Sequence, residues 1–399
     1  MKSLEALVVL DLTHMLSGPY GVMLLTDLGA RTIKIEPPGV GEGTRQLLAG
    51  SKEYSRQGMG AYFITLNRGK ESVCIDLKSE AGRAVFYDLV RKADVVFDNF
   101  SVGVTKRLEI DHAKLAAINP RIITCSVTGF GETGPEPDRP AFDQVVQGMG
   151  GGMSITGFAD RGPVRSGIPI GDLGGGIFGA MGVLAVVVAR EQSGLGQHVD
   201  VSMLDVQISL LNYMATMYLM SGIVPERLGN GHFVHVPYNT YKTRTGFIII
   251  ACIGDAFYEK FLDVVPHPEL RKEKYLKQPD RFADRELINR VIQEELLTDT
   301  AENWLAKLRA ARIPCAPVND FKQALENPQI RARGMVVDVA LHDGEVIRVP
   351  GNPIKLSAAG EGSYAAPPRL GEHTDAVLGQ FLGYRPQRIK ELRETGAIA

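Results

Sequence analysis

The first third of the chain alternates short apolar runs with amphipathic stretches. Four apolar runs predict buried strands: LVVLDL (7–12), RTIKIE (31–36), ADVVFDNF (93–100) and RIITCSVTGF (121–130). Two amphipathic stretches, residues 20–29 and 79–92, predict helices, and Ser79 is the expected N-cap of the second. Strands separated by helices of this length are typical of parallel βαβ units. The pattern therefore predicts a doubly wound α/β large domain that binds ligands outside the carboxyl ends of its strands.

The pattern changes after a long apolar helix expected at residues 205–222. GFIIIACIG (246–254) predicts a strand, and the charged residues that follow predict helices interrupted by prolines. One of these helices places Trp304, Leu305 and Leu308 on one face. We expect a large α/β domain over residues 1–220 and a smaller α+β domain over residues 225–330. Residues 331–399 are expected to return to the large domain.

Composition and charge narrow the class of protein. The 399-residue chain carries a formal net charge of −2 and has no basic run, so no nucleic-acid partner is expected. Leu173–Ala189 is uncharged, but it is short for a membrane span and contains five glycines, which favours a buried helix. The four cysteines are scattered and the histidines lack metal-binding spacing, so no disulfide framework or metal site is expected. A cytoplasmic protein is predicted.

Asp172 is the only acidic residue in RSGIPIGDLGGGIFGAMGVLAVVVAR, and three consecutive glycines follow it after Leu173. One interpretation is a helix N-cap, in which the carboxylate accepts a backbone N–H. The other is a nucleophile that the positive helix end keeps ionised, with glycines that leave room for a bulky electrophile and for an oxyanion. The local sequence leaves both open.

Other motifs give weaker signals. Residues 174–179 match G-x-G-x-x-G, but they lie late in the domain after a poor strand, which disfavours a nicotinamide or flavin enzyme. The chain contains no P-loop and no G-x-S-x-G elbow. His14 follows the first strand, and the Gly/Pro-rich residues 127–143 follow the fourth, both at the expected ligand edge. Taken singly, His14, Lys78 and Arg107 are ordinary polar residues.

Many motifs in order along the chain resemble one family, the class III coenzyme A transferases that include formyl-CoA transferase and carnitine CoA-transferase. They are VLDLTHMLSGPY, LGARTIKIEPPGVGE, NRGKESVCIDLKSEAGR, DVVFDNFSVGVTKRL, SVTGFGETGP, GIPIGDLGGG, SGLGQHVDVSMLD, PERLGNGH, NPIKLS and LGEHTDAVL. The resemblance implies that Asp172 attacks an acyl-CoA thioester and passes through aspartyl anhydride and aspartyl-CoA thioester stages. It also implies coenzyme A thioester as a cosubstrate, no permanent cofactor or metal, and a homodimer whose two chains interlock.

The resemblance assigns eight further positions to the coenzyme A site. They are His14 in the first loop, Ile75 and Lys78 at a strand end near the adenine and phosphates, Asn99 and Phe100 packing on the coenzyme A, Arg107 near the phosphates, and Phe142 over the acyl site, followed by Asp143.

This chain departs from the formyl-CoA transferases at several polar positions. Leu16 replaces a glutamine, and Pro37, Thr128 and Pro140 replace basic residues, which disfavours oxalate and formate as substrates. Four arginines are candidates to bind a second carboxylate: Arg45, Arg68, Arg165 and Arg227. We therefore expect a small dicarboxylate of the succinyl, malyl, citramalyl or mesaconyl type. Transfer between two carboxyl groups of one molecule stays open.

The alternative function is that of an α-methylacyl-CoA racemase from the same superfamily. A racemase needs two acid/base groups on either side of the α-carbon. That branch has a histidine beside the aspartate, and this chain has Phe142 there. A coenzyme A-binding protein without turnover is a third class, and the retained Asp172 disfavours it.

Overall fold

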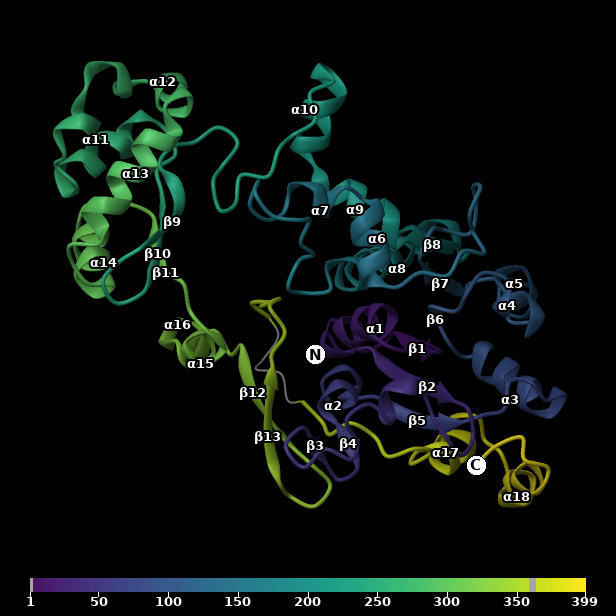
Figure 1. The fold of residues 1–399 in the computed structure, drawn as a ribbon. Coiled ribbons are helices and arrows are strands. Elements are labelled where there is room, and N and C mark those ends of the chain that lie inside the picture. The colour runs from purple at the N-terminus through teal and green to yellow at the C-terminus, as the bar shows by residue number, and fades with distance from the viewer. Residues whose placement is uncertain (1–2, 359–363) are drawn as a thin grey trace. The chain divides into compact units, whose positions relative to one another are not determined.

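The computed structural model describes residues 3–358 and 364–399, in which the chain divides into two compact units (Figure 1). The first unit consists of Met1–Gly152, Arg165–Met220 and Gln329–Ala399. The second consists of Met153–Val164 and Ser221–Pro328. Residues 359–363 of the expected C-terminal segment lie outside the described residues.

The first unit is built on a parallel sheet, which in the described part of the chain has six strands in the order β5-β2-β1-β6-β7-β8. The strands are β1 (Val8–Asp11), β2 (Arg31–Glu36), β5 (Glu71–Cys74), β6 (Val95–Asp98), β7 (Ile123–Thr128) and β8 (His198–Ser202). The expected α/β fold with a large parallel sheet is confirmed. Chain order reverses between β1 and β6, so the loops after these two strands flank the switch point where open α/β sheets bind ligands.

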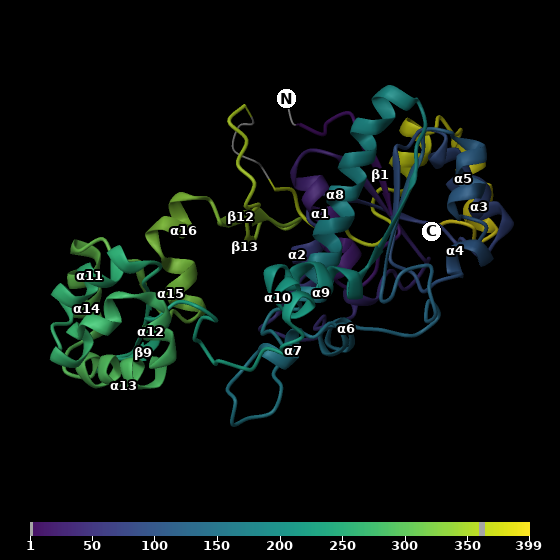
Figure 2. The same cartoon turned by 90° about the horizontal axis from the view of Figure 1, so that it is seen from above.

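Apolar helices cover both faces of this sheet (Figure 2). Val9 and Leu10 of β1 point to opposite faces, since alternate residues of a strand do so, and each belongs to a separate core cluster. One cluster includes α1 (Ser17–Asp27) and α8 (Ile170–Ser193), and the other includes α3 (Glu80–Val90) and α5 (His112–Ile118). Ser79 caps α3 as predicted, because its Oγ accepts the Gly82 N–H at 3.0 Å.

Shorter elements complete the first unit. They are η1 (Gly43–Arg45), β3 (Ser55–Arg56), β4 (Met59–Gly60), α2 (Ala61–Asn67), α4 (Val104–Arg107), α6 (Asp143–Met149), α9 (Met203–Leu211), β12 (Val336–Ala340), β13 (Val346–Pro350), α17 (Thr374–Ala376), η4 (Val377–Phe381) and α18 (Pro386–Glu394). Three short helices, α7 (Gly152–Ile155), α10 (Tyr213–Ser221) and α16 (Pro328–Ala332), lie where the chain passes between units. The single helix expected at residues 205–222 is wrong: the chain breaks at Asn212, whose φ is 48°, into α9 and α10.

The second unit packs helices on an antiparallel sheet of β9 (Tyr238–Lys242), β10 (Phe247–Ala251) and β11 (Cys315–Pro317). Its helices are α11 (Asp255–Val264), η2 (Pro268–Arg271), η3 (Glu273–Leu276), α12 (Gln278–Ala283), α13 (Arg285–Leu296), α14 (Ala301–Ala310) and α15 (Phe321–Glu326). The apolar face predicted on α14 is buried, with Trp304, Leu305 and Leu308 in the core.

Helix α8 is long and apolar enough to cross a membrane, although a core helix of a soluble protein meets the same criterion. One side of α8 packs on α1 and the sheet. The other side is exposed, with Ile177 at 47%, Met181 at 55% and Val188 at 68% of their full accessible surface. The expectation of a buried helix therefore holds for one side of α8 but not for the other within one chain.

Candidate active site

Asp172 is the third residue of α8, and its neighbour Asp143 caps that helix. Oδ1 of Asp143, at the start of α6, accepts the Gly171 N–H at 2.8 Å and the Asp172 N–H at 3.3 Å. Asp172 itself makes no cap, and its carboxylate has no hydrogen bond or ion pair in residues 3–358 and 364–399. The N-cap interpretation of Asp172 is therefore wrong, because the capping role belongs to Asp143.

A short polar chain holds Asp143 in this position. Its Oδ2 accepts a hydrogen bond from Gln147 Nε2 at 2.6 Å, one turn along α6. Gln147 Oε1 accepts the Ser166 N–H at 2.8 Å, which ties the segment before α8 to α6. The first turn of α8 is thus fixed relative to α6, and the Asp172 carboxylate is left free for a ligand.

The environment of Asp172 raises its pKa from 3.8 to about 6. Burial is the larger cause, and the negative charge of Asp143 is the second. We expected the positive helix end to keep this carboxylate strongly ionised, but Asp143 already occupies the first amides of α8. At neutral pH Asp172 is still mainly ionised, and it is more basic than an ordinary aspartate. A carboxylate of this kind is a better nucleophile than a fully solvated one.

The glycines after Asp172 do not leave space for a ligand. A Cβ on Gly174 would lie 2.6 Å from Val206, one on Gly175 would lie 2.9 Å from Val127, and one on Gly176 would lie 2.4 Å from the Ser17 carbonyl oxygen. These positions are filled by α9, β7 and α1. The expectation that the glycines accommodate adducts is wrong, and their role is to let α8 pack closely on its neighbours.

The loops at the switch point bring three of the predicted residues together. Oδ1 of Asn99 accepts the His14 N–H at 2.7 Å, and Asn99 Nδ2 donates to the His14 carbonyl at 2.8 Å. The rings of His14 and Phe100 lie 5.3 Å apart and tilted. Burial, and then the charge of Lys34, lower the pKa of His14, so it is mainly neutral at pH 7. The two hydrogen-bonded loops therefore present a neutral imidazole and an aromatic ring. These groups suit contact with an uncharged part of a ligand.

Helix α1 connects this loop pair to α8. Asn99 Nδ2 also approaches Ser17 Oγ at 3.3 Å, and Ser17 begins α1. The Ser17 carbonyl in turn packs on Gly176, one turn beyond Asp172. The switch-point loops and the first turn of α8 therefore belong to one packed assembly at the carboxyl edge of the sheet.

A group of buried charged side chains holds the backbone of the loop that carries His14. Lys34 Nζ donates to the Thr13 carbonyl at 2.8 Å, and Asp11 Oδ1 accepts the Thr13 N–H at 2.8 Å. Lys70 Nζ donates to Asp11 Oδ2 at 2.8 Å, and all three charged side chains are inaccessible to solvent. Although burial opposes ionisation, Lys34 and Lys70 hold the pKa of Asp11 well below its usual range. Sequence patterns did not single out this group, since Asp11 and Lys34 lie in largely apolar strands and Lys70 lies in the loop before β5.

The structure adds Tyr62 to the site. Burial, and then the nearby charges of Asp172, Glu42 and Asp143, raise the pKa of Tyr62 to about 12. Its hydroxyl therefore stays protonated and can donate a hydrogen bond near Asp172. No local motif marks Tyr62, because α2 reads as an ordinary apolar helix in the sequence.

Phe142 immediately precedes α6 and is 74% exposed, so its ring is available to a ligand beside Asp143. Lys78 and Arg107 are exposed, at the end of the loop to α3 and at the end of α4. Ile75 differs, because its side chain is 1% exposed and packs in the core. Its backbone pairs with Ile398 near the C-terminus, so Ile75 can only shape the strand end that leads to Lys78.

Two of the four candidate arginines are already paired. Arg45 makes two hydrogen bonds to the Glu36 carboxylate, each 2.7 Å, and Arg68 pairs with Asp27. Arg165 is exposed and Arg227 is half-buried, and both bond only to backbone carbonyls of the described chain. Arg227 belongs to the second unit, whereas Arg165 lies next to Ser166, which is held by Gln147. Arg165 is therefore the arginine that the first unit offers near Asp172.

Comparison with known proteins agrees with this geometry. Residues 4–374 match the family described as CoA-transferase family III. The chain belongs to CoA-transferase family III. The resemblance seen in the sequence is confirmed, and the protein is an enzyme that transfers coenzyme A.

Relatives of this CoA-transferase are similar over nearly their whole length. An acetyl-CoA:oxalate CoA-transferase of Acetobacter aceti is 39% identical over 94% of this chain and 95% of its own. A succinyl-CoA:mesaconate CoA-transferase of Haloarcula hispanica is 36% identical over 95% of this chain and 96% of its own. The crystal structure of a CAIB/BAIF family protein from Brucella suis matches with a TM-score of 0.83 and 34% identity, covering 95% of this chain and 99% of that one.

Proposed function

We propose that Asp172 carries out the transfer by becoming acylated. Its carboxylate attacks the thioester carbonyl of an acyl-CoA, the C–S bond breaks, and coenzyme A leaves as a thiolate, which gives a mixed anhydride. The thiolate then attacks the aspartyl carbonyl, releases the first acid and forms an aspartyl-CoA thioester. An incoming carboxylate attacks that thioester and expels the thiolate, which gives a second mixed anhydride. The thiolate then attacks the acyl carbonyl of the new acid, which forms the new acyl-CoA and frees the Asp172 carboxylate. Each step exchanges one acyl oxygen or sulfur bond for another and needs no oxidant.

One observation carries this proposal. Asp172 combines a raised pKa with a carboxylate that has no partner in the described part of the chain, at the ligand-binding edge of a parallel sheet. A half-buried, unpaired carboxylate costs stability, so its retention points to a chemical role.

We propose further that residues 1–220 form the coenzyme A-binding domain, 225–330 a small domain, and 331–399 a segment that returns to the large one. The His14, Asn99 and Phe100 group would contact the nucleotide arm, and Ile75 would shape the strand end beside it. Lys78 and Arg107 are exposed cations that suit its phosphates. Phe142 and Asp143 flank Asp172 and would border the acyl group.

A small dicarboxylate is the substrate class that we favour. The Haloarcula relative is named for succinyl and mesaconyl groups, and Arg165 is an exposed guanidinium in the first unit near Asp172. A guanidinium can bind a second carboxylate in a bidentate manner, which a monocarboxylate cannot use. Succinyl, malyl, citramalyl and mesaconyl groups all carry such a carboxylate. Oxalate should also be tested as an acceptor, because the Acetobacter relative is named for it, although this chain has Leu16 where the formyl-CoA transferases have a glutamine.

We also propose an interlocked homodimer in the cytoplasm. The exposed apolar stripe of α8 supports a second chain on this surface, since soluble monomers rarely expose such stripes. The four cysteines are free in the structure, which suits a reducing compartment.

A matrix of acyl-CoA donors and acid acceptors, read by mass spectrometry, tests the proposed function. We expect new dicarboxylyl-CoA products with the wild type and none with Asp172→Ala. Full turnover by that variant would contradict the proposal. Deuterium uptake at the α-carbon without an acceptor acid would instead indicate a racemase.

A further inference from the structure

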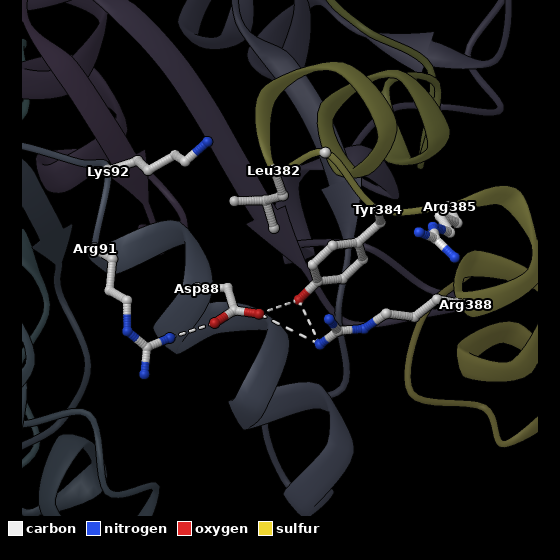
Figure 3. A pocket seen from close by; sticks show the side chains of 8 residues that line it. Asp88, Arg91, Lys92, Leu382, Tyr384, Arg385 and Arg388 are labelled. Carbon is white, nitrogen blue, oxygen red and sulfur yellow. Dashed lines mark hydrogen bonds and ion pairs between the residues drawn. The ribbon is translucent and has the colours of Figure 1, made fainter.

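A cationic pocket lies between the end of α3 and the start of α18 (Figure 3). It has a volume of about 490 Å³. The polar side chains that line it are Asp88, Arg91, Lys92, Tyr384, Arg385 and Arg388. Two segments almost 300 residues apart in sequence therefore contribute two cations each.

The pocket carries a large excess of positive charge. Four cations surround one carboxylate, so the excess is three charges. Asp88 is shared among Arg91, the Tyr384 hydroxyl and Arg388, the last at 3.4 Å. The guanidinium of Arg388 also stacks on the Tyr384 ring at 3.7 Å. Figure 3 shows these side chains gathered around Asp88.

Two of the cations do not share Asp88. Lys92 Nζ donates to the Phe381 carbonyl at 2.6 Å, which is a neutral partner. The guanidinium of Arg385 has no hydrogen bond or ion pair with any residue that the structure describes. Like charges held close together are unfavourable unless an anion lies among them.

This pocket is separate from the Asp172 site. Arg91 and Lys92 precede β6, and the Asp94 N–H donates to the Val8 carbonyl at the start of β1, so they lie at the amino edge of the sheet. The switch-point loops and Asp172 lie at the carboxyl edge. An anion in the pocket would therefore leave the proposed acyl-CoA site open.

We propose that this pocket binds a diphosphate or another small organic polyphosphate. The three excess charges match a diphosphate, whose oxygens suit the planar forks of Arg385 and Arg388. Arg385 is also the residue before α18, a nine-residue helix whose amino end favours negative charge.

A bound polyphosphate would join α3 to the C-terminal segment. Beyond α18, the Ala397 carbonyl accepts the Asp76 N–H at 2.9 Å, and Ile398 pairs with Ile75. Anion binding would therefore stabilise the C-terminal residues on the strand end that leads to Lys78. Hydrogen exchange at residues 397–399 should slow when the ligand is present.

Titration calorimetry with pyrophosphate at physiological ionic strength tests the proposal. We expect binding to the wild type that weakens by at least about tenfold in Arg385→Gln, because one charged contact is lost. The Arg385 guanidinium has no partner among the residues that the structure describes, so this variant should unfold at the wild-type temperature. Asp88→Asn should bind pyrophosphate more tightly, since it removes the opposing carboxylate.

The control is the double variant Lys78→Gln, Arg107→Gln, which should keep wild-type pyrophosphate affinity while its KM for acyl-CoA rises. Citrate is a second probe, and we expect it to bind more weakly than pyrophosphate. Failure of pyrophosphate to bind the wild type would overturn the proposal. So would binding that depends on Lys78 and Arg107 but not on Arg385, or a preference for citrate.

Discussion

At the scale of single residues, the candidate site is an arrangement of two carboxylates with different tasks. The Asp143 carboxylate accepts hydrogen bonds from the first amides of α8 and from Gln147. In the part of the chain that the structure describes, the Asp172 carboxylate has no such partners, and its pKa rises to about 6. A carboxylate whose pKa is raised by its surroundings is typical of acid, base and nucleophile sites.

The acid side of the pH–rate profile should report Asp172. With a pKa of about 6, kcat/KM should rise about tenfold from pH 5 to pH 7, because only the carboxylate attacks. Asp143→Asn keeps an oxygen for the Gly171 N–H but removes the neighbouring charge, so the rise should move to lower pH. An unchanged profile in this variant would mean that another group titrates.

The raised pKa of Asp172 should also lower the stability of the folded protein above about pH 6. The folded chain binds this proton more tightly than the unfolded chain, so the stabilisation is complete below about pH 4 and is lost as pH rises through about 6. Asp172→Asn should therefore raise the free energy of unfolding at pH 8 by about 1–2 kcal/mol, and by less at pH 5. Urea denaturation at the two pH values measures this. Equal gains at both would show that ionisation of Asp172 is not the cause.

Arg165 should decide between acceptor classes. Arg165→Gln should raise the KM for a dicarboxylate acceptor such as succinate by about tenfold or more. It should leave the KM for acetate as an acceptor unchanged. Arg227, a half-buried arginine of the second unit, supplies the matched control Arg227→Gln. Equal losses with both acceptors would assign Arg165 a structural role.

At the scale of elements, the close contact of α1 and α8 aligns the two halves of the site. It depends on Gly21 and Gly176, since a Cβ on either would meet the backbone of the other helix within 2.5 Å. Ser17 lies in the same contact and also meets Asn99. The glycines are thus a device for positioning Asp172 near the switch-point loops.

Gly176→Ala should test this device. The added methyl group meets backbone that cannot rotate away, so we expect a loss of about 1–3 kcal/mol in unfolding free energy and a fall in kcat. Gly50→Ala is the control, because nothing lies within 4 Å of that position, and it should change stability by less than about 0.5 kcal/mol. Similar stability for the two variants would contradict the packing account.

Sequence patterns predicted the elements whose apolar periodicity is strong. β1, β2, β6, β7, α3 and α14 are such elements, and each has a continuous apolar run or face. β5 and β8 were not predicted from their pattern, because Glu71, Ser72, His198 and Asp200 interrupt them with polar residues. The break at Asn212 was also missed, since its neighbours remain apolar and only the backbone turns.

The residues of the candidate site were also predicted only in part. The resemblance supplied Asp172 and Asp143, but the capping of α8 by Asp143 depends on a contact across 28 positions. Tyr62 and the buried group of Asp11, Lys34 and Lys70 depend on similar long-range contacts. Local periodicity carries no information about such contacts.

At the scale of the whole molecule, a single chain exposes an apolar surface to solvent. Ile177, Met181 and Val188 form a stripe along α8 on the side away from its glycines. A stripe of this kind is typical of an interface between subunits.

Light scattering coupled to size exclusion should therefore give twice the mass of one chain. Met181→Glu should lower the dimer fraction or the melting temperature, because it places a charge in the proposed interface. Val346→Glu, at an exposed apolar position on β13, should leave both unchanged. A stable wild-type monomer with full activity would contradict the homodimer.

The most direct test of the central claim is chemical trapping of the acylated aspartate. The enzyme is incubated with succinyl-CoA and hydroxylamine, digested, and analysed by mass spectrometry. We predict a hydroxamate on Asp172, its loss when acyl-CoA is omitted, and no modification in Asp172→Asn. A hydroxamate on another residue, or turnover with no trapped adduct, would contradict covalent catalysis by Asp172.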